Sequence, residues 1–214
     1  MNKLFLLIVS LLIFSCSPSR FVQPLEKDQQ ALSFHMGGSL IDYSGLTIPV
    51  PLTSITYGNG LKENLTLYGS LHTTSLLFNN LHLEVGGLTK IKHQENWIPA
   101  ISSALTLNYV SELTLGNTKL WPQMDANFYW NFKEQKHRLY VGCSAWIDPN
   151  LLNDNIGVIH PHLGYNRRIG KWQLGAELKF LASGYNNSKT FVPYKSLLGD
   201  YGATGVYLNI TKPF

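Results

Sequence analysis

The chain has 214 residues, of which 14% are charged and 44% are hydrophobic. Soluble domains carry about 25% charged residues, so this composition does not suit a surface that faces water, while the apolar content excludes a disordered chain. The formal net charge of +4 comes from scattered residues rather than from a Lys/Arg run, so nucleic acid is not an expected partner.

The first residues, MNKLFLLIVSLLIFSC, predict an export signal. Lys3 precedes an apolar stretch over residues 4–14, which is too short to cross a bilayer and is typical of a signal peptide. The segment IFSC at 13–16 resembles the lipobox of bacterial lipoproteins, in which an aliphatic residue, a small residue and a cysteine occupy these positions. The resemblance implies that residues 1–15 are removed and that Cys16 is lipidated; the alternative is an ordinary secretory signal.

Residues 16–31 are polar and contain prolines, so they are expected to form a tether between the lipid and the folded part. Ser17 follows the cysteine, whereas an Asp there would resemble an inner-membrane retention signal. An acidic cluster, which would resemble the surface-export signal of Bacteroidetes lipoproteins, is absent from the start of the tether. We therefore expect a lipid anchor in the periplasmic leaflet of the outer membrane, which leaves Cys143 without a disulfide partner.

From residue 32 onward, apolar and polar residues alternate with a period of two and no long helical pattern is present. The candidate strands are 32–43, 51–59, 64–75, 81–90, 101–112, 120–132, 138–147, 157–166, 171–181 and the last residues from 205 onward. Ten strands over 32–214 predict an all-β fold, an up-and-down antiparallel transmembrane β-barrel of about ten strands. The count falls to eight if 51–59 and one other segment are not strands.

The connections support the same topology. With both termini at one side, the connections at that side include the short segments 58–63, 133–136 and 167–170 and the longer 90–100. The opposite side has 148–155 and a long segment at 183–202. Short periplasmic turns and longer outer loops are typical of outer-membrane barrels.

The apolar face of each strand is expected to face lipid. In 171–181, Trp172 and Phe180 lie on one face and Glu177 and Lys179 on the other. Large apolar side chains would overfill a narrow lumen, and a closed barrel pairs every backbone group, as lipid requires. Aromatic residues near strand ends are candidates for interfacial girdles; they are Tyr43, Trp97, Trp121, Tyr165 and Tyr201.

The chain ends VYLNITKPF. A last strand that closes on Phe214 resembles the C-terminal signal of bacterial outer-membrane β-barrels, and this resemblance implies the barrel-assembly machinery and outer-membrane lipids as partners, with other outer-membrane proteins as further candidates. A lipid anchor combined with a barrel resembles Bacteroidetes outer-membrane proteins, but no specific family is identified.

Polar side chains on the inward face predict a lumen network. Its members are Glu84, Asp125, Arg138, His160, His162, Glu177 and Lys179. They either fill the lumen as salt bridges or line a small pore. His160 and His162 lie two apart on one face, so with His82 and Glu84 they are weak candidates for zinc or nickel ligands; the alternative is a hydrogen-bonded pair. No cofactor is expected.

No catalytic set is evident. Outer-membrane lipid-A deacylases and phospholipases resemble this chain in size and fold, but their His-x-Ser spacing is absent, and His72 and Ser75 face opposite sides of a strand. We therefore predict a structural or interaction role, as an accessory subunit or as a binder through the loop at 183–202. A small-solute channel and a lipid-modifying enzyme are the alternatives.

Overall fold

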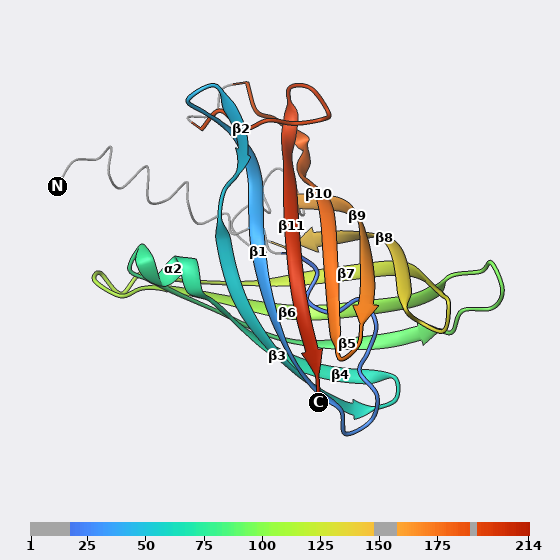
Figure 1. Ribbon diagram of the computed structural model, residues 1–214. Helices are drawn as coiled ribbons and strands as arrows, with labels where there is room; N and C mark the ends of the chain where they lie inside the picture. The colour runs from blue at the N-terminus through green and yellow to red at the C-terminus, as the bar shows by residue number, and fades with distance from the viewer. Residues whose placement is uncertain (1–17, 148–157, 189–191) are drawn as a thin grey trace.

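The protein is a closed antiparallel barrel (Figure 1). The computed structural model describes residues 18–147, 158–188 and 192–214. The strands are β1 (Gln30–Tyr43), β2 (Leu46–Pro49), β3 (Leu52–Lys62), β4 (Leu65–His72), β5 (Asn80–Lys92), β6 (Ala100–Glu112), β7 (Thr118–Phe132), β8 (His137–Trp146), β9 (Val158–Ile169), β10 (Trp172–Asn186) and β11 (Tyr201–Pro213). A short helix, α2 (Thr73–Leu77), lies between β4 and β5.

Ten of these strands form the barrel wall, which confirms the predicted architecture. Each pairs with its neighbours along the chain, and β11 pairs back with β1 from Ala31 opposite Pro213 to Ser39 opposite Gly205. The Phe214 N–H donates to the Gln30 carbonyl (2.8 Å) and the Gln30 N–H donates to the Phe214 carbonyl (3.1 Å). The last residue of the chain thus completes the closure, and the wall has no free edge.

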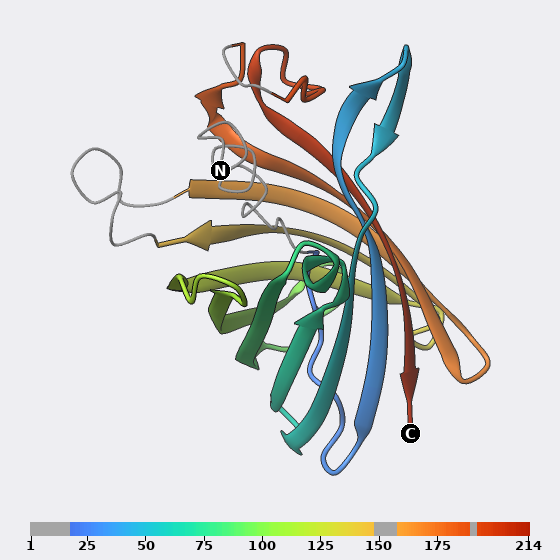
Figure 2. The same ribbon diagram turned by 90° about the vertical axis from the view of Figure 1, so that its left-hand side faces the viewer.

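The eleventh strand, β2, extends the barrel on one side. The first part of β1 pairs with β3, whereas its last residues, Leu40–Tyr43, pair with β2. Between β2 and β3 the chain reads Pro49-Val50-Pro51, and proline has no N–H for a sheet. The β1–β2 hairpin therefore projects from the barrel wall (Figure 2).

The connections between strands lie at the ends of the barrel predicted from the sequence. Short turns join β3 to β4, β7 to β8 and β9 to β10 at the end that holds Gln30 and Phe214, which we call the periplasmic end. The long outer loop expected at 183–202 is shorter, because β10 continues to Asn186 and β11 begins at Tyr201. Its described residues pack on β1: the Lys195 N–H donates to the Leu40 carbonyl (2.9 Å) and the Asp42 N–H to the Pro193 carbonyl (3.1 Å). These bonds satisfy backbone groups of β1 that lie beyond β11.

Apolar side chains cover the outside of the barrel and polar side chains its inside. On β10, Trp172 is 45% exposed and Leu174 41%, while Glu177 and Lys179 are 3% and 2% exposed. This inverted pattern, with each of the ten wall strands paired on both sides, is the architecture of a transmembrane β-barrel of the outer membrane. Within the described residues, no helix is long and apolar enough to cross a membrane.

One of the five girdle candidates points the other way. Trp97, Tyr43, Tyr165 and Tyr201 are exposed, but Trp121 is only 4% exposed and faces the lumen. Trp121 has the same strand parity as Gln123 and Asp125, so the alternation of β7 directs it inward. The prediction that Trp121 faces lipid, made because it is a tryptophan near a strand end, was therefore wrong.

Candidate functional site in the barrel lumen

The chain before β1 fills the lumen. Residues 18–29 are called the lumen plug below. The chain runs inside the barrel as far as Leu25, and residues 26–28 are exposed in a bend at the periplasmic end that leads into β1 (Figure 2). Ser19, Arg20, Val22 and Leu25 are all at most 8% exposed. The sequence predicts a free tether here because the segment is polar and rich in turn-forming residues. In the described part of this segment the polar residues instead contact the lumen wall, because a polar lumen accepts such a segment as readily as water does.

Arg20 anchors the plug in a buried ion pair. Its Nε–H donates to Glu84 Oε2 and its Nη2–H to Glu84 Oε1, both at 2.5 Å. The same Nη2 lies 3.0 Å from His72 Nε2, which is itself 2.7 Å from Glu84 Oε1. A bidentate guanidinium–carboxylate pair is among the strongest polar contacts that a protein makes. The plug is thus tied to β4 and β5 on one side of the barrel.

A second set of contacts ties the plug to the opposite wall. The Ser19 N–H donates to both oxygens of Glu177 (3.2 and 3.3 Å), and the Tyr140 hydroxyl donates to Glu177 Oε2 (2.9 Å). His162 Nε2 lies 2.8 Å from Asn127 Oδ1 and 3.3 Å from the Ser19 hydroxyl. Ser19 and Arg20 together bridge the lumen from β5 to β10.

Further contacts hold the plug toward the periplasmic end. Arg138 Nη2 donates to Gln23 Oε1 (2.7 Å), and the Ser102 hydroxyl donates to the Val22 carbonyl (2.6 Å). The Leu25 N–H donates to the Thr66 hydroxyl (2.8 Å). The plug is therefore fixed along its length by side chains from several strands.

Gly60 on β3 gives the plug room. A Cβ atom built on Gly60 would lie 1.9 Å from the Glu26 carbonyl oxygen. The close approach allows the Asp28 N–H to donate to the Gly60 carbonyl (2.8 Å) and the Gly60 N–H to donate to the Gln29 carbonyl (2.9 Å). The glycine at this position thus has a role in seating the chain against the wall.

The structure places every predicted member of the lumen network inside the barrel. Each is buried, with at most 9% exposure; they are Glu84, Asp125, Arg138, His160, His162, Glu177 and Lys179. On the strands, the three carboxylates outnumber the two basic side chains. Arg20 of the plug supplies the third buried cation. This imbalance in the strand residues was the available signal for the plug.

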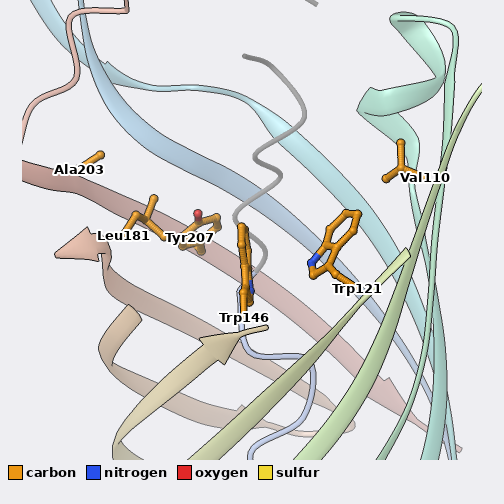
Figure 3. Close-up of a cluster of buried hydrophobic side chains, with 6 residues drawn as sticks. All are labelled: Val110, Trp121, Trp146, Leu181, Ala203 and Tyr207. Carbon is orange, nitrogen blue, oxygen red and sulfur yellow. The ribbon is translucent and has the colours of Figure 1, made fainter. Parts of the chain in front are cut away.

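An apolar layer lies on the outer side of the polar groups (Figure 3). Its members are Val110, Trp121, Trp146, Leu181, Ala203 and Tyr207. The two indole rings lie 6.3 Å apart, and the Trp146 N–H donates to Gln123 Oε1 (2.8 Å). Gln123 in turn donates to the Asp125 carboxylate (3.0 Å). Bulky side chains therefore occupy the lumen beyond the plug.

The four predicted ligand candidates do not come together. His160 Nδ1 accepts the Ala182 N–H (3.0 Å) and the His160 ring packs on Trp146 at 4.6 Å, while His162 contacts the plug. His82 instead stacks on His72, with ring centroids 3.7 Å apart, and its Nε2 lies 3.9 Å from Glu84 Oε1. His72 was not recognised as a lumen ligand because it ends its strand next to α2.

Comparisons with known proteins show similarity in fold and identify no family. The sequence matches no protein-family model and none of the curated proteins with which it was compared. Similar solved structures include the translocator domain of the autotransporter NalP from Neisseria meningitidis, with 12% identity over 90% of this chain and 91% of that one at a TM-score of 0.42. An outer-membrane channel from Pseudomonas putida F1 shares 9% identity over 92% of this chain and all of that one (TM-score 0.47). The NanC porin shares 7% identity over 86% and 98% of the two chains (TM-score 0.43).

The lumen is thus a closed, charge-balanced interior. Three buried cations face three buried carboxylates, and one of the cations, Arg20, belongs to the plug and not to the wall. The wall holds the plug by charged and polar contacts along its length.

Proposed function

We propose that the protein is an outer-membrane barrel that is sealed by its own lumen plug and that acts through its outer end as an interaction protein. The observation that carries the proposal is the burial of Arg20 against Glu84, which fixes the plug across the lumen. The apolar layer around Trp121 and Trp146 adds a second obstruction on the outer side.

Conductance in planar bilayers tests the seal. The wild-type chain should give no stepwise current, and a variant that lacks residues 18–27 should give small steps, because the deletion removes the plug and leaves β1 intact. A matched control deletes residues 113–117 between β6 and β7, which lie at the outer end and outside the lumen contacts. Regular current steps from the wild-type protein would refute the sealed barrel.

The outer end offers a surface for a partner. The β1–β2 hairpin and residues 192–200 form one assembly, held by Lys195 Nζ and Asp42 Oδ2 at 2.9 Å and by the backbone bridge between Ile41 and Tyr194. Large apolar side chains are exposed on it: Tyr43 is 65% exposed and Leu197 69%. Exposed apolar side chains close together are typical of a protein–protein contact.

Replacing residues 188–199 by a short glycine linker tests this role. The change leaves the pairing of Asn186 with Tyr201 possible, so the barrel should assemble. Chemical cross-linking in cells followed by mass spectrometry should then lose the partners captured by the wild-type chain. Lys133→Ala at the periplasmic end is the control. An unchanged set of cross-linked proteins would contradict an outer-end binding role.

A small-solute channel is the second candidate, and the polar lumen favours it. Without the plug, the inner wall would present Glu84, Asp125 and Glu177 against Arg138 and Lys179. Conductance of the wild-type protein separates the two functions. Regular current steps from the wild type would support the channel, whereas a silent wild type with steps only in the plug deletion would support the sealed barrel.

The lipid anchor belongs to the same proposal. Cys16 lies outside the described residues, and three extended residues reach at most about 11 Å from Ser19. Leu25 contacts Thr66, the second residue of β4, near the periplasmic rim, whereas Ser19 contacts Glu177, about 13 Å inside that rim at about 3.3 Å per residue and a tilt of about 40°. The plug therefore leads away from the periplasmic end as it approaches Cys16. We therefore propose that a lipid on Cys16 emerges at the outer end, and not in the periplasmic leaflet expected from the sequence.

Hydrogen exchange of residues 18–27 tests the anchor. In lipidated protein purified from membranes, these amides should be protected to the same extent as in protein expressed without the leader. Free exchange in the lipidated protein alone would place the anchor in the periplasmic leaflet and the plug outside the lumen. Intact mass of the N-terminal peptide shows whether Cys16 carries the lipid.

A further inference from the structure

Two neighbouring strands bring three metal-ligand side chains together in the lumen. His72 ends β4, and His82 and Glu84 lie two apart on β5, so both project inward. One potential ligand atom from each lies within 4.8 Å of the others. All three residues are buried, with at most 5% exposure.

The distances suit one small ion. His72 Nε2 and His82 Nε2 lie 2.7 and 3.9 Å from Glu84 Oε1. Two ligand atoms of a tetrahedral zinc ion with bonds of about 2.0 Å are about 3.3 Å apart, which lies between these values. The imidazole rings are stacked at an interplanar angle of 4°. A shared ion would tilt them apart, since the lone pair of each nitrogen lies in its ring plane.

The histidines near this group are poorly satisfied. Among the residues that the structure describes, neither ring nitrogen of His35 has a hydrogen-bond partner. His82 interacts with the Asn108 side chain, and its Nε2 lies 3.9 Å from Glu84 Oε1, which is beyond hydrogen-bond distance. The His35 and His82 side chains are both only 1% exposed. His35 pairs with Ser54, and Ser54 pairs with His72, so His35 lies in the same row around the barrel. Buried imidazoles without partners require an ion, a proton or water to satisfy them.

A cation already occupies the carboxylate. The Arg20 guanidinium takes both oxygens of Glu84 and contacts His72 Nε2 at 3.0 Å. A divalent ion bound to Glu84 Oε1 and His72 Nε2 would stand within a few ångströms of this guanidinium, and the like charges would repel each other in a buried site.

We propose that His72, His82 and Glu84 form a site for a divalent transition metal of the zinc class, and that Arg20 and the metal exclude each other. Inserting the plug fills the site with a guanidinium. Binding the metal expels Arg20 and loosens the plug. The set of two imidazoles and one carboxylate selects zinc and its neighbours over calcium or magnesium, which prefer oxygen ligands.

Zinc titration of the full-length chain tests the proposal. The untagged protein is folded in detergent, stripped with a chelator and titrated with Zn²⁺ by calorimetry at pH 7.5. Arg20→Met should bind one Zn²⁺ per chain at least about tenfold more tightly than wild type, because an inserted plug leaves few molecules competent to bind. Adding His82→Ala to Arg20→Met should weaken binding at least about tenfold.

His160→Ala in the Arg20→Met background is the matched control, because His160 is a buried lumen histidine outside the group. It should leave the zinc affinity unchanged. His82→Gln provides a second test if the alanine variant does not fold, with folding followed by circular dichroism. In wild type, saturating Zn²⁺ should accelerate hydrogen exchange in residues 18–25.

Three results would overturn the proposal. They are the absence of zinc binding by folded Arg20→Met, an equal loss of affinity in the His160 and His82 variants, and unchanged exchange of the plug in zinc-saturated wild type. The first would mean that the histidines are satisfied by water alone. The third would leave a metal site that does not compete with the plug. None of these results bears on the seal, which conductance tests separately.

Discussion

Replacing Arg20 by methionine should release the lumen plug. Arg20 makes two hydrogen bonds of 2.5 Å to Glu84, and the side chains of both residues are almost fully buried. Removing one partner of a buried pair costs about 3–5 kcal/mol, because the other charge stays buried without compensation. Withdrawal of the plug rehydrates Glu84 and avoids this cost. The balance between inserted and released plug should therefore shift by about 10² to 10⁴, at about 1.4 kcal/mol per factor of ten.

Hydrogen exchange measures this shift directly. The Ser19 and Leu25 amides are held by Glu177 and Thr66 in the inserted state. Their exchange in Arg20→Met should accelerate with the fraction of released plug, while amides of the barrel strands should keep their protection.

A double variant separates charge from packing. Arg20→Met with Glu84→Met removes both charges, so the plug should exchange far more slowly than in Arg20→Met alone. Lys195→Met is the surface control, since its ion pair with Asp42 is half-exposed and contributes less than about 1 kcal/mol. The role of this ion pair would be refuted if the plug amides of Arg20→Met exchanged at the wild-type rate. Equal exchange rates in the single and double variants would refute it as well.

Three other changes test the lipid face, the seat of the plug and the metal site. Leu208→Arg places a charge near the middle of β11 on the outer face, where Leu208 is 51% exposed, and should lower the free energy of unfolding in vesicles by about 2–4 kcal/mol as measured with urea. Gly60→Val should accelerate exchange in residues 24–28, because its Cβ would meet the Glu26 carbonyl, whereas Gly184→Ala, which has open space, should not. Lowering the pH from 7.5 to 5.5 should weaken zinc binding to Arg20→Met at least about tenfold in calorimetry, because protons compete for the imidazole nitrogens.

The alternation of residues was sufficient to predict the barrel. Trp172, Leu174 and Leu208 lie on the outer face because their neighbours in sequence are polar, and lipid accepts only the apolar set. The same parity placed Glu177 and Lys179 in the lumen. Trp121 was assigned to the wrong side only where its residue type was given more weight than its parity on β7.

The contents of the lumen were not predictable in the same way. Local pattern says that Glu84 and His82 face inward, but it does not say which side chains meet across a closed wall. His72 and Glu84 are close because β4 pairs with β5, and Ser19 reaches Glu177 because the barrel brings β10 round to face β5. These distances depend on closure and strand register, which involve the whole chain.

By itself, the sequence determined the strands of this protein. Each strand has one face suited to hydrocarbon and one suited to polar contacts, and the number of strands is sufficient to close a barrel. Only the tertiary structure decided that residues 18–25 lie inside and that Arg20 meets Glu84. The physical reason is that a polar, proline-containing segment is equally compatible with water and with a polar lumen. The choice between them rests on the buried Glu84 carboxylate, which the closed wall presents to Arg20.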